Sequence, residues 1–297
     1  MPTISTLRDL SLSLTEPWFF LFYSLTHIPA TIRQLIKEKQ YGTLLSLSAF
    51  HDALFGTFWA TVGPMVKSTG EMRVIPLLGG RVKDGLIHDE VVSPPIQGTV
   101  IEIGAGSGMW ADVLARFSGG DDNSGIRNRK NASSGITKIY GIEPNAISAK
   151  ALQERVKEVG LGDIYQVVPV GIESVDDPSA WNGKIEPGSV DSIVGVLCLC
   201  SIPEPEKNIK LLYRLLKPGG TWYVYEHVKA NRGGLLTSAY QQFVNLFWRI
   251  PFGSCRLCRD TERYLWNAGE WKEFNIAQPP DEPSYAVCPH IIGTVTK

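Results

Sequence analysis

The sequence has almost no excess of charge of either sign. It contains 29 Lys and Arg against 30 Asp and Glu, a formal net charge of −1. It also has no run of basic residues interleaved with aromatic ones. Proteins that bind nucleic acid concentrate positive charge on one face or segment. We therefore expect no nucleic-acid partner.

Cysteine is scarce, and its five residues are all in the C-terminal third. An odd number clustered in one region does not match the disulfide framework of a small secreted protein. The first residues also lack the cationic start and clean apolar run of a secretory signal. We therefore expect an intracellular protein, either cytoplasmic or peripherally associated with a membrane.

No uncharged apolar run reaches the roughly 20 residues that a spanning helix needs. The most apolar stretch, residues 18–28, is followed by Arg33 and Lys37. Two interpretations of it remain open. It is either a helix packed over the rest of the chain, or a peripheral membrane contact through residues 18–32, with its aromatic rings at headgroup level.

Residues 1–95 are mostly helical by pattern. Between residues 47 and 59, apolar side chains recur at steps of three and four, which places them on one face of a helix. Residues 72–86 are glycine-rich, and we expect them to form a connector. This part of the chain is predicted to be a helical cap or a membrane-associating segment.

From residue 96 onward, short β-type runs alternate with helical stretches, which predicts a single α/β domain over 96–297. Residues 118–138 are rich in Gly, Asp, Asn, Ser and Arg, and we expect an exposed insertion there. We predict a Rossmann-like, seven-stranded, mostly parallel sheet with a C-terminal antiparallel hairpin and an N-terminal helical cap. The expected strands are 99–103, 139–142, 165–170, 190–199 and 221–225, with 271–277 and 287–296 as the hairpin.

A glycine-rich turn, residues 104–108, follows the first strand and opens a helix. Such a turn lets a ligand approach the backbone closely, next to unpaired N–H groups. Glu102 precedes the turn, and Glu143 ends the second strand, where a carboxylate can bind ribose hydroxyls. Two acids next to the turn suit a nucleoside with a cationic amino group and a sulfonium better than one with phosphates. The alternative is that both acids are solvated charges at strand ends.

Four motifs in order give this region a resemblance. Val100 to Gly108 resembles the first motif of class I S-adenosylmethionine methyltransferases, and Ile142 to Asn145 resembles their second acidic loop. Residues 189–194 and 215–220 resemble their fourth strand and the turn before the fifth. Together the motifs imply a class I methyltransferase domain over residues 96–297, with S-adenosylmethionine as cofactor.

A closer resemblance extends to the C-terminus. The segments 197–201, 226–228, 255–261 and 289–293 resemble those of the thiol S-methyltransferases of the methyltransferase-like protein 7 family. The resemblance implies methylation of a small lipophilic thiol and membrane association through the N-terminus. The N-terminal segment and the 118–138 insertion depart from the pattern.

Mapped position by position, the resemblance implies the residues around the cofactor. The methionine part would contact Glu102, Gly104, Ala105, Gly106 and Gly108, and the ribose would contact Glu143 and Pro144. The adenine would lie beside Gly171, Ile172 and Glu173, and the cleft under the cofactor would be lined by Leu197 and Cys198.

The acceptor side has two candidate general bases, His227 after the fifth strand and His290 in the last strand. A thiol or hydroxyl acceptor must lose a proton, and imidazole is suited to this near neutral pH. The alternative for each is a histidine that only forms local hydrogen bonds.

The Cys255-x-x-Cys258 spacing is compatible with a zinc or redox site. A structural zinc site needs four ligands, and only Cys288 and His290 are obvious further candidates. We therefore expect no metal and interpret these cysteines, like Cys198 and Cys200, as small packing residues.

These observations favour methyl transfer from S-adenosylmethionine to a small lipophilic acceptor, with thiol sulfur first. The alternatives are an O- or N-methyltransferase of a secondary metabolite, or a protein that binds the methyl donor without transferring the methyl group. The preference for sulfur as the acceptor atom rests on the resemblance alone, because a fold does not determine a function.

Overall fold

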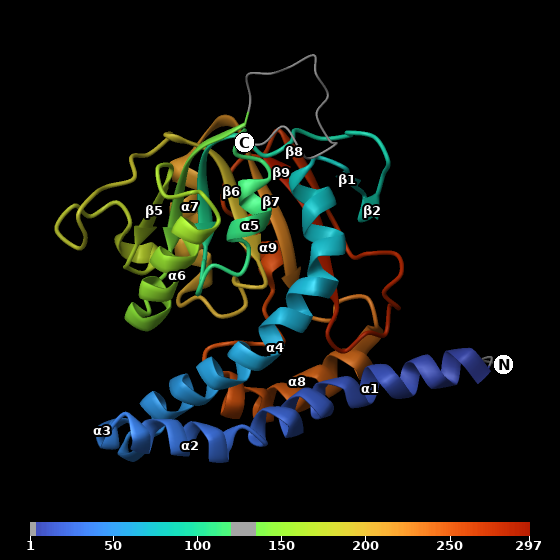
Figure 1. The fold of residues 1–297 in the computed structure, drawn as a ribbon. Helices are drawn as coiled ribbons and strands as arrows, with labels where there is room; N and C mark the ends of the chain where they lie inside the picture. Colours follow the sequence, from blue (N-terminus) through green and yellow to red (C-terminus); the bar gives the residue numbers. More distant parts are fainter. Residues whose placement is uncertain (1–3, 120–134) are drawn as a thin grey trace.

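The computed structural model describes residues 4–119 and 135–297. Its main feature is a seven-stranded sheet of order β5-β4-β3-β6-β7-β9-β8 (Figure 1). All neighbours are parallel from β5 to β7, whereas β9 is antiparallel to both β7 and β8. The strands are β3 (Gly98–Ile103), β4 (Ile136–Ile142), β5 (Tyr165–Val168), β6 (Val190–Val196), β7 (Leu216–His227), β8 (Glu273–Ala277) and β9 (His290–Thr296). The predicted Rossmann-like fold with a C-terminal antiparallel hairpin is confirmed.

The strand order places a switch point at the centre of the sheet. From β3 the chain moves outward to β4 and β5, then returns to add β6 and β7 on the other side. In open parallel sheets, ligands bind beyond the carboxyl ends of the strands at such a point. Hydrophobic clusters bury both faces of this sheet, so its carboxyl edge is the part left for a site.

Helices cover both faces and the carboxyl edge. They are α1 (Ile4–Leu25), α2 (Ile28–Lys37), α3 (Tyr41–Leu45), α4 (Leu47–Leu78), α5 (Ala111–Ala115), α6 (Ala146–Glu158), α7 (Pro205–Leu215), α8 (Gly234–Phe252) and α9 (Thr261–Trp266), with a 3₁₀ turn η1 at Ile172–Ser174. In Figure 1, α1, α2, α3, α8 and the first half of α4 form a layer beyond the carboxyl ends of the parallel strands. The predicted N-terminal helical cap is thus present, and α8 from the C-terminal half completes it.

Several predicted boundaries were wrong. Residues 72–78 are not a connector, because α4 continues to Leu78 and buries Val74 and Leu77 completely. A small hairpin, β1 (Val82–Lys83) with β2 (Leu86–Ile87), follows it. Helix α8 was missed, although it packs on α1 and α4.

Other differences concern where elements begin and end. Strand β7 is longer than predicted and β6 shorter, while the helix after the glycine turn covers only Ala111–Ala115. The hairpin strands begin later than expected, at Glu273 and His290. Of the expected 118–138 insertion, residues 120–134 lie outside the described residues, and residues 136–138 belong to β4.

Helix α1 has two different faces. Leu21 and Ser24 are buried against the rest of the cap, whereas Phe19 and Phe22 are more than 60% exposed. The indole N–H of Trp18 donates to the hydroxyl of Tyr240 in α8 at 2.8 Å. The segment is therefore a helix packed over the domain that also exposes aromatic side chains. Within residues 4–119 and 135–297, no helix is long and apolar enough to cross a bilayer.

Candidate functional site

The glycine turn after β3 is held by contacts that only glycine permits. Gly104, Gly106 and Gly108 all have positive φ. A Cβ on Gly104 would lie 2.5 Å from the Sγ of Cys198, whereas one on Gly106 would have no neighbour closer than 4.0 Å. Gly104 is thus required where the β3 and β6 turns meet, and Gly106 leaves its side of the turn open. A Cβ on Gly108 would contact the side chain of Arg155, so that glycine serves helix packing.

Glu143 connects the ends of β3 and β4. Its Oε2 accepts a hydrogen bond from the backbone N–H of Gly106 at 2.9 Å, and its Oε1 accepts from that of Asn145 at 2.8 Å. Burial raises the pKa of this carboxyl, and the two hydrogen bonds oppose the rise. Glu143 is therefore not a solvated charge, and it shapes the turn while each oxygen retains a lone pair for a ligand. Pro144 is exposed beside it, and Ala105 is buried, with its N–H donating to the carbonyl of Ile142.

Glu102 lies deeper than a strand-end charge. Only 2% of it is exposed, and its Oε2 accepts a 2.5 Å hydrogen bond from the hydroxyl of Tyr165 in β5. Burial raises its pKa to about 7, in part offset by the Tyr165 hydroxyl. Its Oε1 is buried without a partner among the described residues. A buried carboxyl with a free oxygen under the turn is suited to a cationic group.

The ends of β5 and β6 complete this edge. Gly171 leads into η1, where Ile172 is buried in the core, so that only its backbone is available to a ligand, and Glu173 is exposed. After β6, Leu197 has a φ of +52°, a strained conformation for a side chain of this size. Cys198 follows it and is partly buried.

Glu226 in β7 stabilises the strained turn after β6. Its Oε1 accepts hydrogen bonds from the backbone N–H groups of Cys198 and Leu199, both at 2.9 Å. The carboxyl is fully buried, which raises its pKa to about 7. Glu226 was not among the site residues predicted from the sequence. The available signal was its place in segment 226–228, one of the segments that carry the family resemblance.

The two candidate bases lie opposite each other. His227 and His290 are register partners across β7 and β9. The Nδ1 of His290 is 2.8 Å from the Oε1 of Glu282, and its ring stacks on Tyr225. Its Nε2 has no hydrogen-bond partner in the described part of the chain. The Nε2 of His227 is instead 3.3 Å from the Sγ of Cys255.

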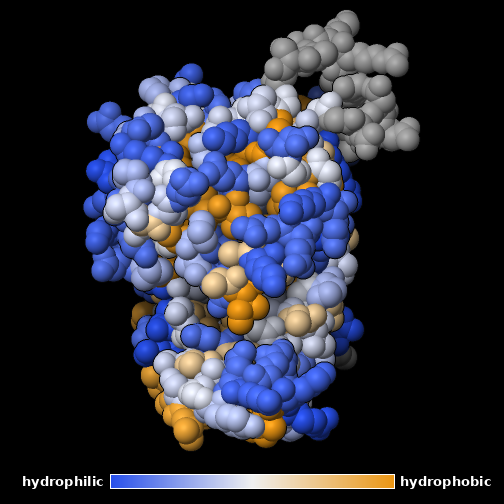
Figure 2. All heavy atoms as spheres, turned by 60° about the vertical axis from the view of Figure 1, so that its left-hand side comes forward, coloured by the Kyte–Doolittle hydropathy of each residue, from blue (hydrophilic) through white to orange (hydrophobic). Residues whose placement is uncertain are grey.

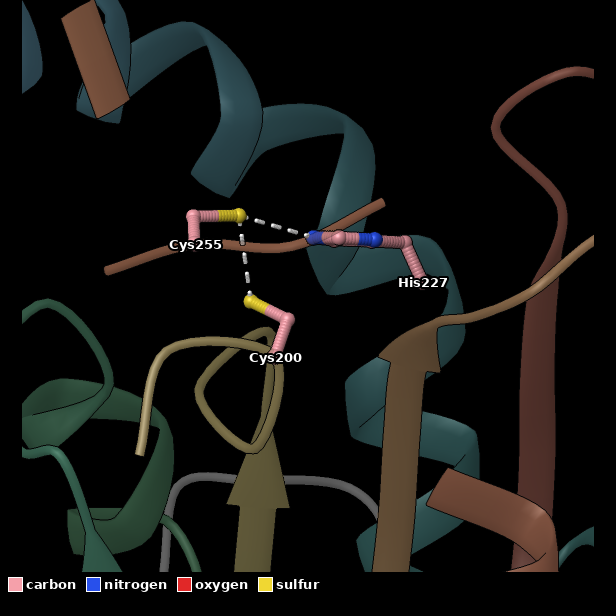
Figure 3. Close-up of side chains that lie close together, drawn as sticks. All are labelled: Cys200, His227 and Cys255. Carbon is pink, nitrogen blue, oxygen red and sulfur yellow. Dashed lines mark hydrogen bonds between the residues drawn. The ribbon is translucent and has the colours of Figure 1, made fainter. Parts of the chain in front are cut away.

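Of the Cys255-x-x-Cys258 pair, only Cys255 belongs to the group of metal-binding side chains that the described residues bring together. Cys255 lies beside Cys200 and His227, with 3.5 Å between its Sγ and that of Cys200 (Figure 3). The considered ligand set of Cys255, Cys258, Cys288 and His290 is not brought together within ligand distance in the described residues. Sequence spacing could not reveal the observed group, because its members come from three separate segments.

Comparisons with known proteins address the family and the fold of the chain. A family model described as a methyltransferase domain matches residues 90–269, more than half of the chain. The chain belongs to this methyltransferase family. The chain is also similar to the crystal structure of an O-methyltransferase candidate from Nostoc punctiforme, with a TM-score of 0.53 and 14% identity. The match covers 96% of this chain and 71% of that protein, and it supports the fold alone.

Two human methyltransferases are among the curated relatives of this chain. Thiol S-methyltransferase TMT1B is 35% identical over 115 residues, and TMT1A is 34% identical over the same length. Each alignment covers 38% of this chain and 46% of the relative, so the chain spans about half the length of the curated relatives it matches. A ubiquinone biosynthesis O-methyltransferase from Paracidovorax citrulli is 29% identical over 143 residues, 48% of this chain and 49% of that protein.

The site of this methyltransferase family member fits the predicted cofactor, S-adenosylmethionine. The Oε1 of Glu102, which has no partner among the described residues, can accept a hydrogen bond from the cationic amino group. The open space beside Gly106 can take the methionine part of the cofactor. The carboxylate of Glu143 can accept hydrogen bonds from the ribose hydroxyls. The bound cofactor supplies a methyl group on a sulfonium. The chain's own residues would then have to position an acceptor atom next to that methyl group.

Proposed function

We propose that the protein transfers the methyl group of S-adenosylmethionine to the sulfur of a small lipophilic thiol. The observation that carries the proposal is the Glu143–Gly106 hydrogen bond, which joins the turns after β3 and β4. We propose that the nucleoside binds at this edge. The preference for sulfur is supported by the similarity to the two human thiol S-methyltransferases.

The surroundings of the β6 and β7 ends support a lipophilic acceptor. The cap covers these ends with buried apolar side chains from α1, α4 and α8. The cluster consists of Leu21, Phe58, Val62, Cys200, Val244, Trp248, Phe252, Cys255 and Leu257. An acceptor that reaches the methyl donor from the cap side contacts carbon and sulfur atoms more than charges, which favours an apolar molecule.

Among the two candidate bases we assign proton removal to His290. The Glu282 carboxylate accepts from its Nδ1–H, which fixes the tautomer and leaves Nε2 as the proton acceptor. The proton of the acceptor thiol passes to this Nε2, and the sulfur of the resulting thiolate attacks the methyl carbon. The Nε2 of His227 is directed at the Sγ of Cys255, so we do not assign the base role to His227.

The remaining cofactor contacts are proposed for the edge described above. The methionine part contacts Glu102 and the turn residues Gly104, Ala105, Gly106 and Gly108. The adenine lies beside Gly171, Ile172 and Glu173. The cleft under the cofactor is lined by Leu197 and Cys198. Positioning at this edge supplies much of the rate acceleration, because methyl transfer is an in-line displacement.

Methyl transfer is tested with labelled S-adenosylmethionine and a panel of lipophilic thiols, phenols and amines at equal concentration. We expect labelled thioether to form faster than any other product. Faster labelling of phenols or amines would favour an O- or N-methyltransferase, consistent with the similarity to the O-methyltransferase of P. citrulli. Binding of the cofactor without transfer to any acceptor would favour a protein that no longer methylates.

A further inference from the structure

Three metal-binding side chains converge under the cap. Cys200 lies in the turn after β6, His227 is the last residue of β7, and Cys255 follows α8 (Figure 3). The Sγ of Cys255 is 3.3 Å from the Nε2 of His227 and 3.5 Å from the Sγ of Cys200. All three potential ligand atoms lie within 4.8 Å of one another.

These separations are close to those of a metal centre. Tetrahedral zinc with sulfur ligands at about 2.3 Å and imidazole at about 2.0 Å places the ligand atoms roughly 3.5–3.8 Å apart. Two of the three edges already approach that range, so binding requires only small side-chain movements. We propose that Cys200, His227 and Cys255 bind Zn²⁺ and leave its fourth coordination position to the acceptor thiol.

Charge balance supports a divalent ion at this place. Cys200 is 2% exposed and Cys255 is 8% exposed, within an apolar cluster where an uncompensated charge is costly. Binding of Zn²⁺ releases the two thiol protons, and the two thiolates then neutralise the ion. The indole N–H of Trp248 points to the Sγ of Cys255 at 3.3 Å and would stabilise the thiolate.

A fourth, anionic ligand would leave the centre with one negative charge, and a cation lies next to it. The guanidinium of Arg259 donates to the carbonyl oxygen of Cys200 at 3.0 Å. This arrangement favours a thiolate as the fourth ligand. Three protein ligands and one open position are typical of catalytic zinc sites, whereas structural sites have four protein ligands.

The location connects the metal to the methyl donor. Cys200 is two residues after Cys198, whose sulfur lies against Gly104 of the donor turn. This acceptor role rests on the proposed function. The acceptor thiol loses its proton to His290 on binding zinc, and its sulfur attacks the methyl carbon while the sulfonium carbon–sulfur bond breaks. The neutral thioether is a weaker ligand than the thiolate and leaves with S-adenosylhomocysteine.

Metal binding is tested on the full-length, reduced, metal-free protein, with Zn²⁺ stoichiometry from equilibrium dialysis and Co²⁺ as the absorption probe. We expect about one ion per chain and a cobalt spectrum with thiolate charge-transfer bands. Cys200→Ser and Cys255→Ser should each weaken binding at least tenfold, and Cys258→Ser, the matched control, should not. A stoichiometry near zero, or equal loss in Cys258→Ser, would overturn the site.

The open position is tested by adding a lipophilic arenethiol to the Co²⁺-loaded protein. A third thiolate should increase the charge-transfer intensity, and an unchanged spectrum would refute the acceptor role. The two proposals fail differently. Equal thiol methylation by wild type and Cys255→Ser would exclude a catalytic metal and leave the proposed function standing, whereas metal binding without any thiol methylation would refute that function and leave the metal site.

Discussion

The carboxylate of Glu143 accepts a hydrogen bond from the backbone N–H of Gly106 across the ends of two neighbouring parallel strands. The side chain that is proposed to bind the ribose therefore also shapes the turn proposed to bind the methionine part. The same carboxylate is proposed to bind the ligand and holds the turn in place. Its removal should therefore lower the affinity for the cofactor by more than the loss of one hydrogen bond would.

Replacement Glu143→Gln should weaken binding of S-adenosylhomocysteine about 10- to 100-fold, measured by calorimetry. The amide retains only one acceptor oxygen, so it cannot accept from Gly106, Asn145 and a ribose hydroxyl together. Glu154→Gln, an exposed position on α6, is the matched control and should bind as wild type. Equal affinity in both variants would place the nucleoside elsewhere.

Replacement Gly104→Ala should lower the free energy of unfolding by about 2–4 kcal/mol. The new Cβ would lie 2.5 Å from the Sγ of Cys198, and the backbone φ of +63° adds strain. Gly219→Ala, with a similar positive φ but open space around it, isolates the conformational cost. Denaturant unfolding of both variants should show the larger loss at Gly104, and similar losses would contradict the close approach of the two turns.

Glu102 should make stability depend on pH in an unusual direction. Burial raises the pKa of this carboxyl from 4.5 to about 7, so the fold favours its neutral form. The contribution of Glu102 to the free energy of unfolding, at most about 3 kcal/mol, is fully present below about pH 4.5 and is lost as the pH rises through 7. The wild type should lose stability relative to Glu102→Gln between pH 5 and 8 in thermal melts. A constant difference over this range would exclude the raised pKa.

Replacement His290→Gln should reduce thiol methylation about 10²- to 10⁴-fold near neutral pH and leave cofactor affinity unchanged. The rate should recover as the pH approaches the ionisation of the acceptor thiol, because an ionised acceptor needs no base. Glu282→Gln should lower the rate less, because it removes only the group that orients the ring. His88→Gln, outside the site, serves as the control. Retention of full activity in His290→Gln would exclude His290 as the base.

We also predict that the cap contacts a membrane surface, with a wider patch than residues 18–32. Apolar side chains are exposed on the cap, and Figure 2 shows apolar colour at its lower edge. The most exposed of them on α1, the α3–α4 region and α8 are Phe19, Phe22, Leu45, Leu47, Leu235, Leu236 and Leu246. Exposed apolar patches mark membrane or protein contacts, which supports the prediction.

Liposome co-sedimentation checks the patch. The variants Phe19→Ser/Phe22→Ser and Leu235→Ser/Leu236→Ser should each partition at least about tenfold less than wild type, since each pair loses the burial of two large apolar side chains. Trp266→Ser, which removes an apolar side chain 62% exposed on α9, is the control. Equal partition of all four proteins would remove the membrane proposal.

The sequence alone determined the order of the seven sheet strands along the chain and the position of the glycine turn. Apolar periodicity and turn residues are local signals, and the turn, Glu102 and Glu143 lie beside strands that the pattern identifies directly. It did not determine where α4 ends, and it did not show that α8 is a helix that joins the cap, because Val74, Leu77 and the α8 contacts are fixed by distant partners.

Only the tertiary structure decided which side chains meet at the carboxyl edge. It buried Glu102 against Tyr165, directed Glu226 to the turn after β6, and joined Cys200, His227 and Cys255, residues up to 55 positions apart. Such meetings depend on the parallel register of the strands and on how the cap packs over their ends. No local spacing encodes those two properties, because both arise from long-range packing that the whole chain produces together.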